Sequence, residues 1–333
     1  MPTSASLRVF IAAILLALAA AFVVLPASAQ RQPAEVNPTA QSVKERQLLN
    51  EVQRIQGRGT LPDTRSRVLE QPEGRAWREF RTVTLRWIGA IAILGMLALL
   101  VAFYLIRGMV KIENGRSGRT LVRFNAFERF VHWMTAGSFV VLALSGLNIT
   151  FGRELILPLI GPAAFTGLSQ WAKYAHNFLS FPFTIGVIVM FLMWLAWNLP
   201  TPADLRWIAQ GGGIVGDSHP PAKRFNAGQK AIYWVVVLGG GATAITGYLL
   251  MFPFYVTDIA GMQTAQMVHA VVGLLFIAIM LAHIYIGTIG EQGAFEAMGS
   301  GSVDVNWARQ HHSLWLEQEA QRGRVSGGAT PAE

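Results

Sequence analysis

The chain has 333 residues, of which 52% are hydrophobic and only 14% are charged. This balance excludes an ordinary pair of soluble domains and indicates an integral membrane protein. The net charge of +8 does not indicate nucleic-acid binding, because the basic residues cluster beside apolar stretches, where a membrane surface accounts for them. Cysteine is absent, which excludes disulfides, covalently attached haem and cysteine-ligated iron–sulfur clusters in this chain.

The N-terminal region combines an apolar stretch with a long polar segment. Residues 9–25 are apolar, follow Arg8 and precede Ala27-Ser28-Ala29, a pattern typical of a signal peptide with an A-x-A cleavage site. We therefore expect residues 1–29 to be a cleaved signal peptide, with an uncleaved membrane anchor as the alternative. Residues 30–86 are rich in proline and charge and are predicted to form a polar periplasmic arm, with an amphipathic helix at Ser42–Gln56.

Five later stretches are apolar and long enough to cross a bilayer. The first, residues 87–106, has aromatic residues near both ends, as membrane-interface anchoring favours. The other four lie within a predicted core at residues 107–290, as helices at 130–151, 176–199, 231–252 and 263–290. Residues 291–333 are mixed in charge and are predicted to form a cytoplasmic tail with a disordered, glycine-rich end.

The distribution of basic residues predicts the orientation of the helices. The connections 107–129 and 201–230 are rich in Lys and Arg and are therefore predicted to face the cytoplasm. The mature N-terminus would then be periplasmic and the C-terminus cytoplasmic, in a bacterial inner membrane. Four arginines before residue 87 oppose this assignment, and export directed by the signal peptide resolves the conflict.

The last predicted helix carries two histidines, His269 and His283. Ionisable residues at membrane depth are costly and mark a functional site by default. Their spacing corresponds to roughly 21 Å along a helix and places both on nearly the same face. Gly273 and Gly287 follow them by four positions, which leaves an empty patch beside each imidazole where a flat macrocycle could lie. The alternative is close helix packing around two structural histidines.

Two further histidines are predicted at matching depths. His132 opens the helix at 130–151 at its cytoplasmic end, and His176 opens the next helix at its outer end. Pairing by depth joins His176 with His269 and His132 with His283. Iron with two imidazole ligands needs ring nitrogens roughly 4 Å apart on facing helices. The pattern therefore predicts two haem b groups, with the irons roughly 21 Å apart.

Other polar and small residues receive weaker interpretations. Two basic residues that precede histidines by three positions are candidate partners of haem propionates, with membrane-interface anchoring as the alternative: Arg129 and Lys173. A glycine run indicates close helix packing: Gly239, Gly240, Gly241 and Gly247. Three histidines on polar segments are predicted to be solvated: His219, His311 and His312.

Over residues 119–319 the sequence resembles the gamma subunit, a membrane cytochrome b, of respiratory formate dehydrogenase. The resemblance rests on five motifs: R-F-V-H-W at 129–133, K-Y-A-H at 173–176, R-F-N-A-G-Q-K at 224–230, V-H-A-V-V-G at 268–273 and W-A-R-Q-H-H-S-L-W at 307–315. The histidine pattern is shared with hydrogenase and thiosulfate-reductase cytochromes. The N-A-G-Q-K and W-A-x-x-H-H motifs favour formate dehydrogenase.

The resemblance implies an all-α integral membrane protein with a four-helix di-haem core, here extended by one additional N-terminal transmembrane helix. It implies that electrons arrive from an iron–sulfur beta subunit, whose alpha partner carries molybdenum or tungsten and oxidises formate, and that they leave to membrane quinone. The haem nearer the beta subunit would use His176 and His269, and the haem nearer the quinone would use His132 and His283. The shorter family members have no counterpart of residues 30–106.

The resemblance also assigns a quinone site to Asn226, Gly228 and His283. An amide at the membrane boundary can donate a hydrogen bond to a quinone carbonyl. Judged without the family, Asn226 and Gly228 are equally well explained as a turn before a helix.

Two other functions remain open. One is the cytochrome b subunit of a membrane-bound hydrogenase or a related molybdoenzyme, which has the same path of electron transfer through the haems but a different electron donor. The other is a haem-free transporter or assembly scaffold, whose membrane histidines relay protons or bind a partner.

Overall fold

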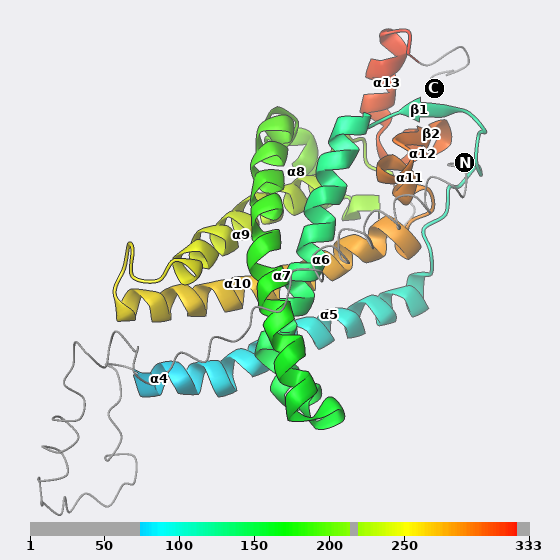
Figure 1. Cartoon of the computed structure of the whole chain (residues 1–333). Coiled ribbons are helices and arrows are strands. Elements are labelled where there is room, and N and C mark those ends of the chain that lie inside the picture. Colours follow the sequence, from blue (N-terminus) through cyan, green and yellow to red (C-terminus); the bar gives the residue numbers. More distant parts are fainter. Residues whose placement is uncertain (1–73, 214–218, 325–333) are drawn as a thin grey trace, which may run out of the picture. The chain divides into compact units, whose positions relative to one another are not determined.

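The computed structural model describes residues 74–213 and 219–324 (Figure 1). The predicted signal peptide and the Ser42–Gln56 helix lie outside the described residues. The described part contains five helical segments that are long and apolar enough to cross a membrane: Gly74–Arg107, Ala126–Leu155, Leu157–Trp197, Ala227–Met251 and Ile259–Gly290. This agrees with the predicted all-α membrane fold of four core helices and one additional N-terminal helix.

The first segment begins earlier than its hydropathy predicts. Helix α4 (Gly74–Glu79), a π-helical turn η2 (Phe80–Thr84) and α5 (Leu85–Arg107) run on continuously, so residues 74–86, at the end of the predicted arm, are helical. Arginine favours helix almost as strongly as leucine, so charge ends the apolar stretch without ending the helix. Helix α5 packs along α10.

Helices α6 (Ala126–Leu155) and α7 (Leu157–Trp194) form a long hairpin, and α7 continues into η3 (Leu195–Trp197). The prediction of a loop before residue 176 is wrong. One residue, Ile156, separates α6 from α7, and within α7 the backbone departs from helical geometry at Gly161, which has φ 77°. The segment before residue 176 contains two prolines and two glycines, which favour a loop in the sequence, together with Ser169, Gln170 and Lys173, which lower its hydropathy, yet it is helical apart from Gly161. His176 therefore lies well inside α7, and His132 lies in the second turn of α6.

Helices α9 (Ala227–Met251) and α10 (Ile259–Tyr285) form a second pair, preceded by α8 (Pro202–Ala209) and η4 (Gly211–Gly213). Helix α10 ends in a π-helical turn, η5 (Ile286–Gly290). The predicted close packing of the glycine run is confirmed for three of its four members. Gly239 faces Phe276, Gly240 faces α7, and Gly247 faces His269.

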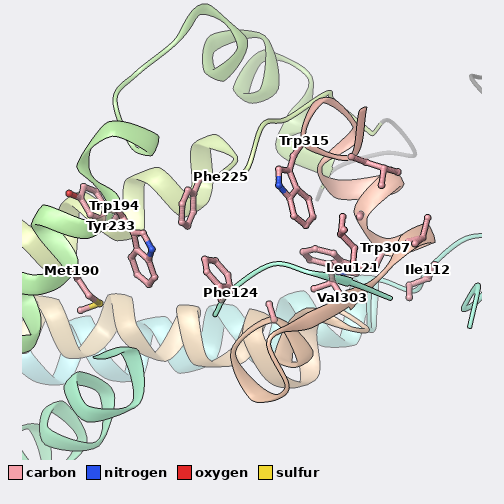
Figure 2. Packing of buried hydrophobic residues seen from close by; sticks show 14 of the residues in the cluster. Ile112, Leu121, Phe124, Met190, Trp194, Phe225, Tyr233, Val303, Trp307 and Trp315 are labelled. Carbon is pink, nitrogen blue, oxygen red and sulfur yellow. The ribbon is translucent and has the colours of Figure 1, made fainter. Parts of the chain in front are cut away.

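The predicted polar tail is folded as far as the structure describes it. It contains α11 (Ala294–Gly299), β2 (Ser302–Asp304), α12 (Val305–His311) and α13 (Ser313–Gln321). Strand β2 pairs antiparallel with β1 (Thr120–Val122), which lies in the basic connection before α6. Figure 2 shows the buried cluster that joins the tail to the helix ends, with Phe124 and Phe225 between Trp194 on one side and Trp307 and Trp315 on the other.

The prediction that the tail histidines are solvated is wrong. His312 has no exposed surface, its Nδ1 lies 2.7 Å from the Lys223 carbonyl oxygen, and its ring packs against Trp307 and Trp315. The His311 side chain is only 11% exposed. The segment was interpreted as solvated because its charge is mixed. It also contains two tryptophans, which are buried in the structure, and the neighbouring histidines are buried with them.

His219 is also engaged rather than fully solvated, because its Nε2 lies 2.6 Å from Glu113 Oε1.

A buried polar cluster fixes the ends of three helices near this tail. Glu128, in the first turn of α6, accepts hydrogen bonds from Trp194 Nε1 and Arg224 NH2, both at 2.8 Å. Its second carboxylate oxygen accepts the backbone N–H of Asn125 at 2.9 Å, completing a capping box. Because Glu128 and Arg224 are both largely buried and bonded to each other, they hold the start of α6, the end of α7 and the approach to α9 in one arrangement.

Candidate functional site

The structure brings His132 of α6 beside His283 of α10, with ring centroids 6.3 Å apart. Two iron–nitrogen bonds of about 2 Å, extended by an imidazole ring radius of about 1.1 Å at each end, give a centroid separation of about 6.2 Å. The two rings therefore have the spacing of imidazoles that share one iron.

The second pair has nearly the same geometry. His176 of α7 and His269 of α10 have ring centroids 6.1 Å apart, and their ring planes are inclined by 65°, as they are in the first pair. Both pairs therefore use α10, which contributes one histidine to each. The spacing of His269 and His283 along that helix separates the two pairs by roughly 21 Å.

Open space accompanies both histidines of α10. A Cβ atom added to Gly273 or Gly287 would meet no atom within 4 Å. In the described part of the chain, no group of three or more His, Cys, Asp or Glu side chains could hold a metal ion. A porphyrin supplies four equatorial nitrogens itself and needs only the axial pair. These residues therefore fit a haem iron better than a metal ion held by protein alone.

The Nδ1 atoms of the second pair each contact a hydroxyl group. Ser145 Oγ lies 2.8 Å from His176 Nδ1, and Thr246 Oγ1 lies 3.1 Å from His269 Nδ1. Neither hydroxyl residue was predicted, because its sequence signal is no more than a small polar residue inside an apolar helix. His132 Nδ1, in contrast, is buried without a hydrogen-bond partner among the described residues.

The two basic residues beside the histidines occupy different environments. Arg129 donates from NH1 to the Gly299 carbonyl at 2.8 Å, while its Nε is buried without a partner among the described residues. Lys173 is exposed. Each lies one turn before a histidine on the same helix, so the assignment to haem propionates stays a prediction.

Asn226 has a structural role at the start of α9. Its Oδ1 accepts the backbone N–H of Gln229 at 2.9 Å, and the Gln229 side chain accepts the Asn226 N–H at 3.2 Å. This capping box supports the interpretation as a turn before a helix. The cap uses Oδ1 and leaves the Nδ2 group able to donate.

Gly228 lies beside Asn226, whereas His283 does not. A Cβ atom added to Gly228 would approach Trp207 to 3.2 Å and Asn226 Oδ1 to 3.4 Å. On α9 and α10, Gly239 faces Phe276 and Gly247 faces His269. If α9 and α10 keep this antiparallel alignment, His283 lies opposite residue 233 of α9. Asn226 is seven residues before residue 233, which corresponds to roughly 10 Å along the helix. The quinone assignment stays a prediction.

Comparison with known proteins identifies relatives of this chain. The family model described as prokaryotic cytochrome b561 matches residues 123–301. The formate dehydrogenase cytochrome b556(fdo) subunit of Escherichia coli K12 is 29% identical over 202 residues, which cover 60% of this chain and 93% of that protein. The nitrate-inducible cytochrome b556(Fdn) subunit of the same strain is 25% identical over 206 residues, covering 60% and 92%. A formate dehydrogenase cytochrome b556 subunit of Haemophilus influenzae is 26% identical over 219 residues, covering 63% and 88%.

The family match spans more than half of the chain and includes all four paired histidines. Together with the five apolar helices, it identifies a multi-pass membrane protein that binds haem b. This chain belongs to the prokaryotic cytochrome b561 family.

Proposed function

We propose that this chain is the membrane cytochrome b subunit of a formate dehydrogenase complex. In this function it passes electrons from an iron–sulfur subunit, through two b haems, to membrane quinone. Formate itself would be oxidised on a partner subunit that carries molybdenum or tungsten. The names of the three relatives support this assignment, because each is a cytochrome subunit of formate dehydrogenase.

The observation that carries the proposal is the presence of two histidine pairs at iron-sharing distance, 6.1 and 6.3 Å between ring centroids. His176 and His269 would hold one haem, and His132 and His283 would hold the other. Held between two imidazoles, a b haem supplies reversible one-electron transfer at its iron. The protein's contribution is to fix the spacing of the two sites and to exclude water from the space between them.

The proposed direction of electron flow follows from the predicted orientation. The pair His176 and His269 would lie near the periplasmic face, close to the electron donor, and the pair His132 and His283 would lie near the cytoplasmic face. A quinone reduced at the cytoplasmic side takes up two protons there, so electron transfer would separate charge across the membrane. Asn226 Nδ2 could donate a hydrogen bond to the quinone carbonyl, whose oxygen gains negative charge during reduction.

Purification of the full chain with its natural partners, after haem-replete expression, tests the proposal. We expect a pyridine haemochrome assay to give two b haems per polypeptide and mass spectrometry to identify an iron–sulfur subunit and a molybdenum or tungsten subunit. Formate should then reduce the b-type absorbance bands, and added quinone should reoxidise them.

Two results would contradict the proposal in different ways. A co-purified nickel–iron subunit would support the hydrogenase alternative, with the haem assignment intact. A purified chain without a dithionite-reducible b-type spectrum would contradict haem binding itself and favour a transporter or scaffold.

A further inference from the structure

Two hydroxyl groups contact the histidines of one pair only. Ser145 Oγ of α6 lies 2.8 Å from His176 Nδ1, and Thr246 Oγ1 of α9 lies 3.1 Å from His269 Nδ1. Ser145 is 4% exposed, so water does not compete freely for its contact. These residues come from the two helices that do not carry the histidines of this pair, so all four core helices contribute to it.

The hydroxyl protons are already committed to the backbone. Ser145 donates to the Val141 carbonyl at 2.7 Å, and Thr246 donates to the Ala242 carbonyl at 2.6 Å, each one turn earlier on its own helix. A hydroxyl has a single proton to donate but two lone pairs that accept. Toward the imidazoles both hydroxyls therefore act as acceptors. The backbone of Leu142 also hydrogen-bonds His176, and that of Thr243 hydrogen-bonds His269. Because carbonyl oxygens only accept, all these contacts agree with a proton on Nδ1.

This hydrogen bonding fixes the tautomer of both histidines. With the proton on Nδ1, the lone pair of each ring lies on Nε2, the nitrogen that can bind iron. Accepting the Nδ1 proton also raises the basicity of the ring as a metal ligand. A more basic ligand stabilises ferric iron relative to ferrous iron and therefore lowers the reduction potential of the haem.

In the other pair, the histidine on α6 has no such contact with a hydroxyl group, because His132 Nδ1 is buried without a hydrogen-bond partner in the described ranges. We propose that Ser145 and Thr246 are positioning residues that orient His176 and His269 and lower the reduction potential of the haem between them below that of the second haem. Electron flow from the first haem to the second is then downhill. This inference rests on the proposed di-haem function.

The experiment is a potentiometric titration of the b-type absorbance bands in the purified complex. Ser145→Ala and Thr246→Val remove the hydroxyl groups, and each should raise the same one of the two haem potentials while leaving the other unchanged. We expect the ferrous-to-ferric ratio of that haem at a fixed ambient potential to increase by up to tenfold, which is about 59 mV for a one-electron couple.

Matched controls lie on the same helices. Thr150 of α6 donates to the Gly146 carbonyl at 3.0 Å, and Thr243 of α9 donates to the Gly239 carbonyl at 3.0 Å. The backbone of Thr243 hydrogen-bonds His269, but Thr243→Val leaves that backbone contact in place and removes only a hydroxyl that bonds its own helix. Thr150→Val and Thr243→Val should move neither potential. Ser145→Thr and Thr246→Ser keep a hydroxyl group and should hold the wild-type potentials.

The possible outcomes separate this inference from the proposed function. If two haems are present and neither potential moves in Ser145→Ala and Thr246→Val, the inference is wrong and the di-haem function stands. If the variants that keep a hydroxyl shift the potential as much as those that remove it, side-chain volume is the cause and the inference is again wrong. If Ser145→Ala loses one haem that Ser145→Thr retains, the hydroxyl is needed to hold the ligand, which supports the inference. A wild-type protein without haem would contradict the proposed function instead.

Discussion

Phe139 and Phe276 pack against each other between the two histidine pairs, with ring centroids 4.8 Å apart. Phe276 lies seven residues from both His269 and His283 on α10. Phe183 of α7 completes the cluster, with ring centroids 6.3 Å from Phe139 and 6.4 Å from Phe276. Three aromatic side chains therefore fill the space between the two proposed haem sites and leave little room for water.

Replacing Phe276 by alanine should destabilise the protein without removing its histidine ligands. Phe276 is 4% exposed, and truncating a buried phenylalanine costs about 3–5 kcal/mol because a cavity remains. We expect a clear decrease in the thermal midpoint of haem loss, measured from the Soret band of the purified protein. Phe178→Ala on α7 is the control, because that side chain is 70% exposed. Equal decreases in both variants would contradict the role of the cluster.

Double variants test which histidines share an iron. We expect His132→Ala and His283→Ala each to remove one haem, so that the pyridine haemochrome content is halved. The double variant should lose no more haem than either single variant, because both changes destroy the same site. Combining His132→Ala with His269→Ala should instead remove both haems.

His219→Ala is the control for these variants, since His219 contacts Glu113 and not a paired histidine. It should keep both haems. Complete haem loss in the double variant of His132 and His283, with half the haem in each single variant, would contradict the pairing.

The core of the fold was predictable from sequence because its helices are long apolar stretches. The histidine pairs were predictable because the four histidines lie near the ends of these stretches, at two matching depths. The helix ends were less predictable. The first part of α7 contains prolines and glycines, which are typical of a loop, followed by Ser169, Gln170 and Lys173, which lower its hydropathy, although the segment is helical apart from Gly161. Likewise, α4 is rich in arginine and precedes the apolar stretch without a break.

The contacts that refine the site could not be predicted from sequence. The contact between Ser145 and His176 joins residues 31 apart, and its geometry depends on how α6 packs on α7. The tail was missed for a related reason. Trp307 and Trp315 lie in a segment of mixed charge, and they are buried in the folded protein within the same cluster as Phe124 and Phe225.

Asn226→Asp separates the capping role of Asn226 from its proposed role in quinone binding. Aspartate keeps an oxygen that can cap α9, so the stability of the protein should change little. It lacks the Nδ2 donor, so quinone reduction should slow while both haems remain reducible by dithionite. The measurements are quinone-dependent reoxidation of the haems and the haem content of each variant.

Asn226→Ala provides the comparison, because it removes both the cap and the donor. It should slow quinone reduction similarly and also cost about 1 kcal/mol of stability through loss of the cap. Unchanged quinone kinetics in Asn226→Asp would remove this residue from the quinone site and leave it only a helix cap.

Acidification should undock the folded tail at His312. Burial, with a smaller contribution from Arg123, lowers the pKa of His312 well below 6.5, and burial also lowers the pKa of His311. An unfolded tail therefore binds more protons than the docked tail once the pH falls below about 6.5. The docked tail therefore has its full stability above that pH. Below it, the free energy of docking becomes less favourable by up to about 1.4 kcal/mol per pH unit for each histidine that stays neutral in the docked tail.

Hydrogen exchange of residues 305–321 at pH 7.5 and pH 5 measures this effect, and exchange should be faster at pH 5. His312→Gln should accelerate exchange at pH 7.5, because the ring that packs between Trp307 and Trp315 is lost. It should also reduce the difference between the two pH values, because glutamine does not titrate. If the variant keeps the full pH dependence, titration of His312 is not what destabilises the docked tail, and the neighbouring His311 becomes the residue to test.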